Sequence, residues 1–222
     1  MESQKFSELG EREREQYNKG LERGGYEKIF NHCRYFYIRR RYSLIKEMMQ
    51  CAQGKKVLEI GSTAWRGWLD NNSILPSSLT CINISEAELQ AGVDSAASSD
   101  NSPDFILMDA HDLQFEDGTF DFVYGDAILH HLNMVPALDE IFRVLKPNGK
   151  ILFVEPLDVN PAGKLVRSLT KKARTSDEQP LRLCDITEIK KRFETQFFYE
   201  ELLSVPCGVL SGMLFKNSSN SL

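Results

Sequence analysis

The run KKVLEIGSTAWRGWL, residues 55–69, constrains the fold more than any other stretch of this chain. Its apolar first half is typical of a buried strand, and Gly61 then allows a tight turn. Ser62 or Thr63 can cap a helix that starts after the turn. A strand that breaks in this way into a helix is where doubly wound α/β proteins hold a nucleotide-like ligand.

Apolar runs alternate with helical patterns along the rest of the chain. A strand–helix–strand repeat of this kind predicts an α/β fold with a doubly wound, mostly parallel, Rossmann-like sheet and helices on both faces. The predicted strands are Lys56–Ile60, Leu79–Ile84, Asp104–Met108, Phe120–Tyr124 and Lys150–Glu155.

Four further helices are predicted from apolar spacing and from start signals. One of them opens on the capping-box spacing of Ser85 and Glu88. A second is Tyr26–Met49, with one buried face, and a short one runs from Asp185 to about Phe193. The remaining helix ends at Pro147 and Gly149, and its apolar stripe consists of Val135, Leu138, Ile141, Phe142 and Leu145.

The length of 222 residues predicts one domain with additions rather than two domains. We expect residues 1–54 to form a helical extension, 55–156 the ligand-binding core, and 157–222 an insertion and late strands. Residues 1–16 are so highly charged that we expect a loose end outside the core. The late apolar runs, Gln196–Leu203 and Val209–Phe215, are candidate edge strands.

Charge and cysteine usage exclude several classes of protein. A net charge of −5 argues against a general nucleic-acid binder, which needs a basic face. The five cysteines form no CxxC pair and have no histidine spacing suited to zinc, so we expect no metal site and a reducing, cytoplasmic location. Because the first residues are polar and charged, we expect no signal peptide, and no apolar run is long enough to span a bilayer.

Polar or small residues follow each of the first four predicted strands. Asn83 ends the second strand, at the place that meets ribose hydroxyls in dinucleotide sites, and Asp109 follows the third. Gly125 and Asp126 follow the fourth. All of these residues are expected at the carboxyl edge of the sheet, where such folds bind ligands.

Three segments resemble the class I methyltransferases that use S-adenosylmethionine, in particular the branch that acts on small molecules. They are VLEIGS at 57–62, MDAHDLQFEDGTFDFVYGDAILHHL at 108–132 and ALDEIFRVLKPNGKILFVEP at 137–156. The resemblance covers about 100 residues, and the combination is specific because the segments keep the family's spacing.

The resemblance implies a set of residues that bind S-adenosyl-L-methionine. In it, Asp109 accepts from the adenine amino group, the Ala110 backbone N–H reaches a ring nitrogen, and Asn83 faces the ribose. A cationic cofactor tolerates nearby carboxylates, whereas the negatively charged pyrophosphate of NAD would be repelled by them. The carboxylates in this set therefore favour S-adenosylmethionine over NAD. The whole implied set is Glu59, Gly61, Ser62, Thr63, Asn83, Ile84, Asp109, Ala110, Gly125 and Asp126.

The chain departs from the family pattern at three places. Thr63 and Trp65 stand where the family has glycines, which restricts how closely the backbone can approach the ligand. Asn83 replaces a carboxylate and so loses charge-assisted hydrogen bonding. Asn148 replaces a turn glycine, a change that turn geometry tolerates.

His131 and His130 are the candidate catalytic residues, because an imidazole suits a general base. Their alternative role is capping and packing at a strand–helix joint, and His131 is preferred as the base. Tyr17 and other amino-terminal tyrosines are expected to close over the cofactor. The insertion after the fifth strand is either a substrate lid or a plain crossover, and as a lid its arginines favour an acceptor with carboxylate or phosphate.

The sequence therefore predicts a methyltransferase that moves a methyl group to an O or N atom of a small-molecule acceptor, without a metal. Aromatic residues such as Trp68 and the basic run Arg39–Arg41 are more simply explained by packing and by a solvated helix face. One alternative is a protein that keeps the fold but acts as a binding or regulatory partner. An NAD-linked oxidoreductase, or an RNA or protein acceptor, fits the residues less well, and oligomeric state is left open.

Overall fold

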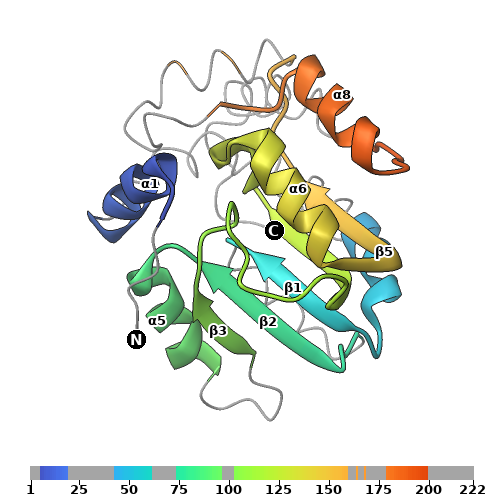
Figure 1. The fold of residues 1–222 in the computed structure, drawn as a ribbon, viewed down its shortest axis with the longest axis horizontal. Coiled ribbons are helices and arrows are strands. Elements are labelled where there is room, and N and C mark those ends of the chain that lie inside the picture. Colours follow the sequence, from blue (N-terminus) through green and yellow to red (C-terminus); the bar gives the residue numbers. More distant parts are fainter. Residues whose placement is uncertain are drawn as a thin grey trace, which may run out of the picture.

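In a computed structural model, the chain forms a five-stranded sheet with helices on both faces (Figure 1). The structure describes residues 6–19, 43–61, 74–96, 103–159, 164, 168 and 179–199. In chain order the elements are α1 (Glu8–Lys19), η1 (Gln50–Ala52), β1 (Lys56–Ile60), β2 (Ser78–Asn83), α5 (Glu86–Ala96), β3 (Asp104–Leu107), β4 (Phe120–Asp126), η2 (Leu129–His131), α6 (Met134–Val144), β5 (Leu145–Val154) and α8 (Leu183–Arg192).

The strand order is β3-β2-β1-β4-β5, and every pair of neighbours is parallel. This order reverses direction between β1 and β4, which confirms the doubly wound arrangement. The five predicted strands are confirmed, with bounds that differ from the predicted ones by at most two residues except at β5. That strand begins at Leu145 rather than Lys150, because its pairing with β4 jumps from Leu145 to Lys150 across an irregularity at the Phe120–Phe122 step.

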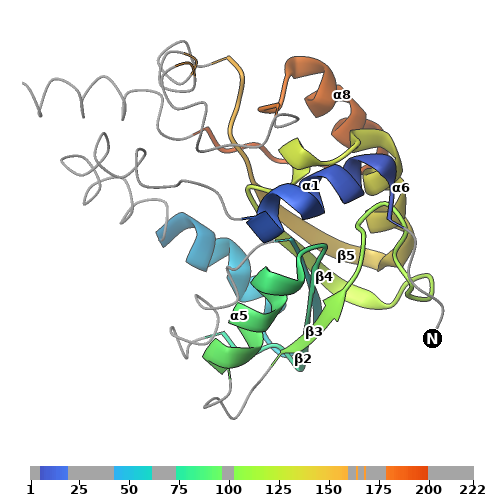
Figure 2. The ribbon, with the colours of Figure 1, turned by 90° about the vertical axis from the view of Figure 1, so that its left-hand side faces the viewer.

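Each face of the sheet is buried against its own group of helices, as the near-continuous apolar runs of parallel strands require. Alternate residues of β1 divide between the two sides: Leu58 lies in one core with α6 and α8, and Val57 lies in the other with α5 and the end of helical residues 43–49. Figure 2 shows α5 and α6 on opposite sides of the strands.

The helix predictions are confirmed for α5, α6 and α8, but the stripe predicted for α6 is wrong in part, because Leu145 already belongs to β5. The Ser85 hydroxyl accepts from the Glu88 N–H at 3.3 Å, so the predicted start of α5 is correct. On α6, Leu138 and Ile141 are fully buried, but Val135 and Phe142 are 43% and 56% exposed. The predicted stripe was too wide, and Phe142 instead packs edge-on against Phe193 at the end of α8.

The expectation of a loose amino terminus is wrong. Residues 8–19 form α1, which lies across the ends of the strands toward which the β1 and β2 arrowheads point in Figure 1. Polar contacts hold it there: Arg14 pairs with Glu86 at the start of α5, and the Asn18 amide donates to the same carboxylate at 2.9 Å. The helix lacks an apolar stripe, so local periodicity could not reveal that it docks.

Several predictions lie outside the described residues. These are Ser62 and Thr63, both tryptophans, the helix pattern over residues 26–42, the tyrosines and arginines within that pattern, most of the insertion 160–178, and the run Val209–Phe215. Of Gln196–Leu203 the structure describes residues 196–199, which form no strand. Among the described residues, no helix has both the length and the apolar character that crossing a membrane would require.

Candidate functional site

The turn after β1 is locked to the end of β2. Gly61 has φ +66°, and its N–H donates to the Ile82 carbonyl at 2.8 Å. The Asn83 amide donates to the Gly61 carbonyl at 3.2 Å and accepts from the Ser85 N–H at 3.0 Å. Among the residues that the structure describes, no other group uses the remaining N–H and lone pair of the Asn83 amide, which suffice to meet a ligand hydroxyl.

Glu59 and Ile84 flank this turn in different environments. Glu59 is fully buried in β1, and the Cys81 thiol of β2 points at its carboxylate, with 3.9 Å between Sγ and Oε2. Burial, together with the Glu59 carboxylate, raises the pKa of the Cys81 thiol far above its usual range, so this thiol stays protonated. Ile84, which follows β2, is half-buried.

The carboxylate of Asp109, just after β3, accepts four hydrogen bonds from the chain itself. Oδ1 accepts from the His111 N–H at 3.0 Å and from His111 Nδ1 at 2.6 Å. Oδ2 accepts from the Ser7 N–H at 2.8 Å and from the Ser7 hydroxyl at 2.7 Å. A carboxylate has about four lone-pair sites, so the side chain predicted to meet adenine is fully engaged.

The partners of Asp109 are themselves fixed. His111 Nε2 accepts from the Asn133 N–H at 2.8 Å, which places the proton of a neutral ring on Nδ1, facing Asp109. Burial alone would raise the pKa of Asp109, but the bonds from His111 and Ser7 outweigh it and hold that pKa well below its usual range. Ala110, which follows, is buried, with 4% of its surface exposed.

Ser7 also caps α1, which explains how the helix reaches Asp109. Its hydroxyl accepts from the Gly10 N–H at 3.0 Å, in the position of a helix N-cap. A Cβ on Gly10 would lie 2.6 Å from Asp109 Oδ2, so only glycine lets the first turn approach this closely.

His130 is held by Glu155, a residue that our predicted site did not include. The Glu155 carboxylate follows β5 and accepts from the N–H groups of Ile128 and Leu129 at 2.9 and 2.8 Å. Its second oxygen lies 2.8 Å from His130 Nδ1. The group that caps the backbone at this joint is therefore Glu155, and His130 contributes only its contact with that carboxylate.

His131 faces α1 instead. Its Nδ1 lies 3.1 Å from Oε2 of Glu13, and its Nε2 lies 3.3 Å from the Tyr17 hydroxyl. Both His131 and Glu13 are buried, at 8% and 2% exposure. The rings of the two predicted histidines therefore contact each other, with 4.1 Å between their centroids, but their other partners differ: His130 meets the residue after β5, and His131 meets the amino-terminal helix.

Gly125 and Asp126 end β4 beside this pair of histidines. Gly125 is buried, and a Cβ there would lie 2.6 Å from side-chain atoms of both Ile128 and Phe153. Asp126 is half-buried at the carboxyl end of the strand. The predicted residues of β1, β2, β3 and β4 that the structure describes thus meet at one edge of the sheet, as expected.

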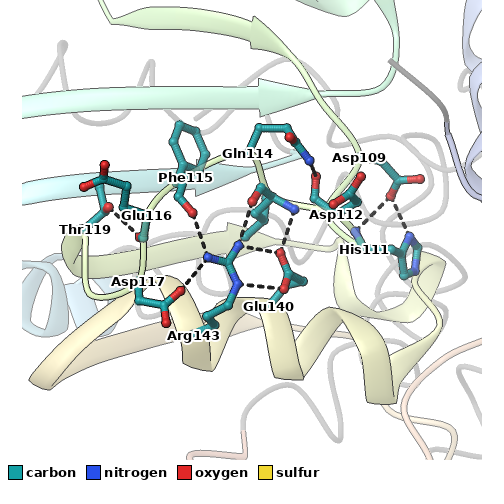
Figure 3. A network of polar contacts seen from close by, with 11 residues as sticks. Asp109, His111, Asp112, Gln114, Phe115, Glu116, Asp117, Thr119, Glu140 and Arg143 are labelled. Atoms are coloured by element: carbon teal, nitrogen blue, oxygen red, sulfur yellow. Dashed lines mark hydrogen bonds and ion pairs between the residues drawn. The ribbon is translucent and has the colours of Figure 1, made fainter. Parts of the chain in front are cut away.

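The loop between β3 and β4, residues 108–119, is held to α6 by Arg143 (Figure 3). The Arg143 guanidinium donates to the Phe115 and Leu113 carbonyls at 2.7 and 2.6 Å, to Asp117 at 2.8 Å, and to both oxygens of Glu140. Glu140 in turn accepts from the Leu113 N–H at 2.8 Å. Hydrogen bonds with Glu140 and Asp117 raise the pKa of Arg143, and the same contact with Arg143 lowers the pKa of Glu140.

Comparison with known proteins adds a family and a set of relatives. Residues 58–153 match the family model described as a methyltransferase domain. A glycine/sarcosine/dimethylglycine N-methyltransferase of Actinopolyspora halophila is 33% identical over 89 residues, which is 39% of this chain and 16% of that enzyme. A demethylmenaquinone methyltransferase of Staphylococcus aureus is 33% identical over 110 residues, 48% of this chain and 45% of that protein.

A solved structure extends the likeness of the fold. A putative sarcosine dimethylglycine methyltransferase from Galdieria sulphuraria superposes with a TM-score of 0.56 at 18% identity, over 82% of this chain and 72% of that one. At that identity the match speaks for the fold alone. The chain spans less than half the length of the two curated relatives described above.

Proposed function

We infer that this protein, whose residues 58–153 belong to the class I S-adenosylmethionine-dependent methyltransferases, moves a methyl group to an O or N atom of a small-molecule acceptor. The observation that carries this proposal is the meeting of polar groups from four strand ends at one sheet edge, where this fold binds its ligands. One curated relative is by name a glycine/sarcosine/dimethylglycine N-methyltransferase, which supports a nitrogen acceptor. A cytosolic location and an anionic acceptor remain proposals from the sequence.

The residues at this edge suit a cationic cofactor. Glu59, Asp109 and Asp126 place carboxylates along it, and Asn83 has spare bonding capacity for a hydroxyl. Asp109 fits the adenine amino group only if Ser7 gives up at least one of its two bonds, because no lone pair is otherwise left. These residues therefore fit S-adenosylmethionine, provided that the first turn of α1 moves away from Asp109.

When bound, S-adenosylmethionine supplies an electrophilic methyl group on a sulfonium. Asn83 and Asp109 would orient its nucleoside half, and Asp126 would lie toward its charged half. His131 would accept a proton from an acceptor that arrives protonated. Helix α1, which covers Asp109 and His131, would exclude water from both.

Calorimetry with S-adenosylmethionine tests the cofactor site. We expect Asp109→Ala to weaken binding by about 1 to 3 kcal/mol, as for a lost hydrogen bond to a charged group. The neighbouring Asp112→Ala is the control, because Asp112 is exposed. Absence of binding to the wild-type protein at about millimolar cofactor, a generous limit for a specific site, would contradict the proposal.

A second candidate function is a binding or regulatory protein on the same fold. It is favoured by the saturation of Asp109 by Ser7 and His111 and by Asn83 in place of a carboxylate. Incubation with methyl-labelled cofactor and fractionated cell extract separates the two. A labelled small molecule supports the enzyme, whereas tight cofactor binding without transfer to any fraction supports the binding protein.

A further inference from the structure

We propose that Glu13 of α1 is a positioning residue for His131, holding the ring proton on Nδ1 so that Nε2 keeps the lone pair that takes the acceptor's proton. This inference rests on the proposed function, in which His131 is the base. It adds a residue that the sequence indicated only as part of a charged, loose end.

The environment of Glu13 is unusual for a glutamate. Its side chain is 2% exposed, and neither carboxylate oxygen has a hydrogen bond within the described part of the chain. Its Oε2 nevertheless lies 3.1 Å from His131 Nδ1, close enough for an ion pair although not aligned as a hydrogen bond. A buried carboxylate without partners is costly, so this contact is the one that can compensate for burial.

The opposite side of the same ring faces Tyr17. Glu13 and Tyr17 are four positions apart on α1 and therefore lie on the same side of the helix. Nε2 of His131 lies 3.3 Å from the Tyr17 hydroxyl. A carboxylate at Nδ1 favours the tautomer in which Nδ1 carries the proton and Nε2 holds the lone pair, the arrangement that a base at Nε2 needs.

The proton and the electrons balance in the resulting step. The acceptor's proton passes to Nε2 of His131, and the freed lone pair of the acceptor O or N forms a bond to the methyl carbon. The carbon–sulfur bond breaks, and its electron pair stays on sulfur, which becomes a neutral thioether. The imidazolium that forms is stabilised by the Glu13 carboxylate at 3.1 Å. Because Glu13 belongs to α1, the pair exists only while α1 is docked.

Ring ¹⁵N chemical shifts of His131, measured on the labelled protein without cofactor and assigned with His131→Gln, test the pair directly. We expect the proton on Nδ1 in the wild type, and on Nε2 in most molecules of Glu13→Ala. Glu13→Gln keeps an acceptor for Nδ1 but loses the charge. Glu15→Gln is the matched control on the same helix, because the Glu15 side chain is 72% exposed and pairs with Lys19.

Kinetics then test the role in catalysis. We expect Glu13→Gln to lower kcat about 10- to 100-fold, a part of what a general base contributes, with the KM for the cofactor within about twofold. An unchanged ring tautomer in Glu13→Ala, or an unchanged kcat in Glu13→Gln, overturns the proposal. If Glu13→Ala does not fold, Glu13→Gln decides alone. A tautomer shift in a protein that methylates no acceptor would refute the proposed function and leave only the pairing.

Discussion

Ser7 donates both its backbone N–H and its hydroxyl to a single oxygen of Asp109, at 2.8 and 2.7 Å. The two residues are 102 positions apart, so this contact joins the cap of α1 to the end of β3. The oxygen that adenine is expected to use is therefore already bound by the chain. Cofactor affinity should depend on how readily Ser7 releases it.

Ser7→Ala should strengthen binding of the cofactor or of its demethylated product. The substitution removes one of the two donors on Asp109 Oδ2 and the hydroxyl that caps α1 at Gly10. The cofactor no longer has to displace a hydrogen bond with a net free energy of about 1 kcal/mol. Calorimetry should therefore show an affinity about fivefold higher than that of the wild type. Ser7→Thr keeps the hydroxyl and should bind like the wild type. Weaker binding by Ser7→Ala would mean that Ser7 contributes to the bound state.

The central sheet could be predicted from the sequence because its signals are local. The run that became β1 has the same bounds in the structure as in the prediction, and the cap of α5 at Ser85 is where the spacing placed it. Parallel strands buried on both faces leave continuous apolar runs, and these need no knowledge of distant residues.

The covering of the site could not be predicted in the same way. Helix α1 docks through Ser7, Glu13 and Arg14, whose partners outside the helix lie at least 72 positions away and carry no local signal. Glu155 and Arg143 lie inside the segment that resembles the family, but only the structure shows what they hold. Polar contacts between distant segments are thus the part that sequence patterns miss.

Arg143→Met should destabilise the protein by about 2 kcal/mol, because the loop over residues 113–117 loses its donors and two carbonyls lose their partners. Arg143→Lys should recover little of the loss, since one ammonium cannot replace the planar fork that reaches both Leu113 and Glu140. Urea unfolding measures both. Lys191→Met is the control: it breaks an exposed pair with Glu188 and should change stability by less than about 0.5 kcal/mol.

Docking of α1 should weaken in acid. The hydrogen bond from Arg14 is the main cause that lowers the pKa of Glu86 from 4.5 to about 2. A carboxyl whose pKa is depressed in the folded state stabilises that state above its unfolded pKa, and loses this contribution as pH falls through the folded pKa. Between pH 4.5 and about 2, the protonation of Glu86 should therefore loosen α1. The pKa of Asp109 is also lowered, so its contact with Ser7 acts in the same direction.

Amide hydrogen exchange checks this pH dependence. Protection factors for residues 8–19 should fall on acidification more than those of α6, whose buried side chains face the core. Glu86→Gln removes the charge that pairs with Arg14 and should reduce the pH dependence. Equal loss of protection in α1 and α6 would indicate global acid unfolding rather than release of α1.

Gly61→Ala and Gly54→Ala together separate backbone strain from crowding at the turn after β1. Both glycines have φ +66°, so an alanine at either position pays about 1 to 2 kcal/mol for the left-handed conformation. A Cβ at Gly54 meets nothing within 4 Å, whereas one at Gly61 would overlap the end of the Ile128 side chain. Urea unfolding should therefore show a further loss of about 1 to 3 kcal/mol for Gly61→Ala, the cost of overpacking.

Gly61→Ala should also weaken cofactor binding, because Ile128 follows β4 beside the predicted methionine end of the site and would have to move. Adding Ile128→Val to Gly61→Ala removes the overlapping methyl group, Cδ1, and should restore part of both losses. Gly54→Ala should leave affinity unchanged, since Gly54 precedes β1 at the opposite end of the strand. If Gly54→Ala and Gly61→Ala lost equal stability and equal affinity, contact with Ile128 would not be the reason for glycine at position 61.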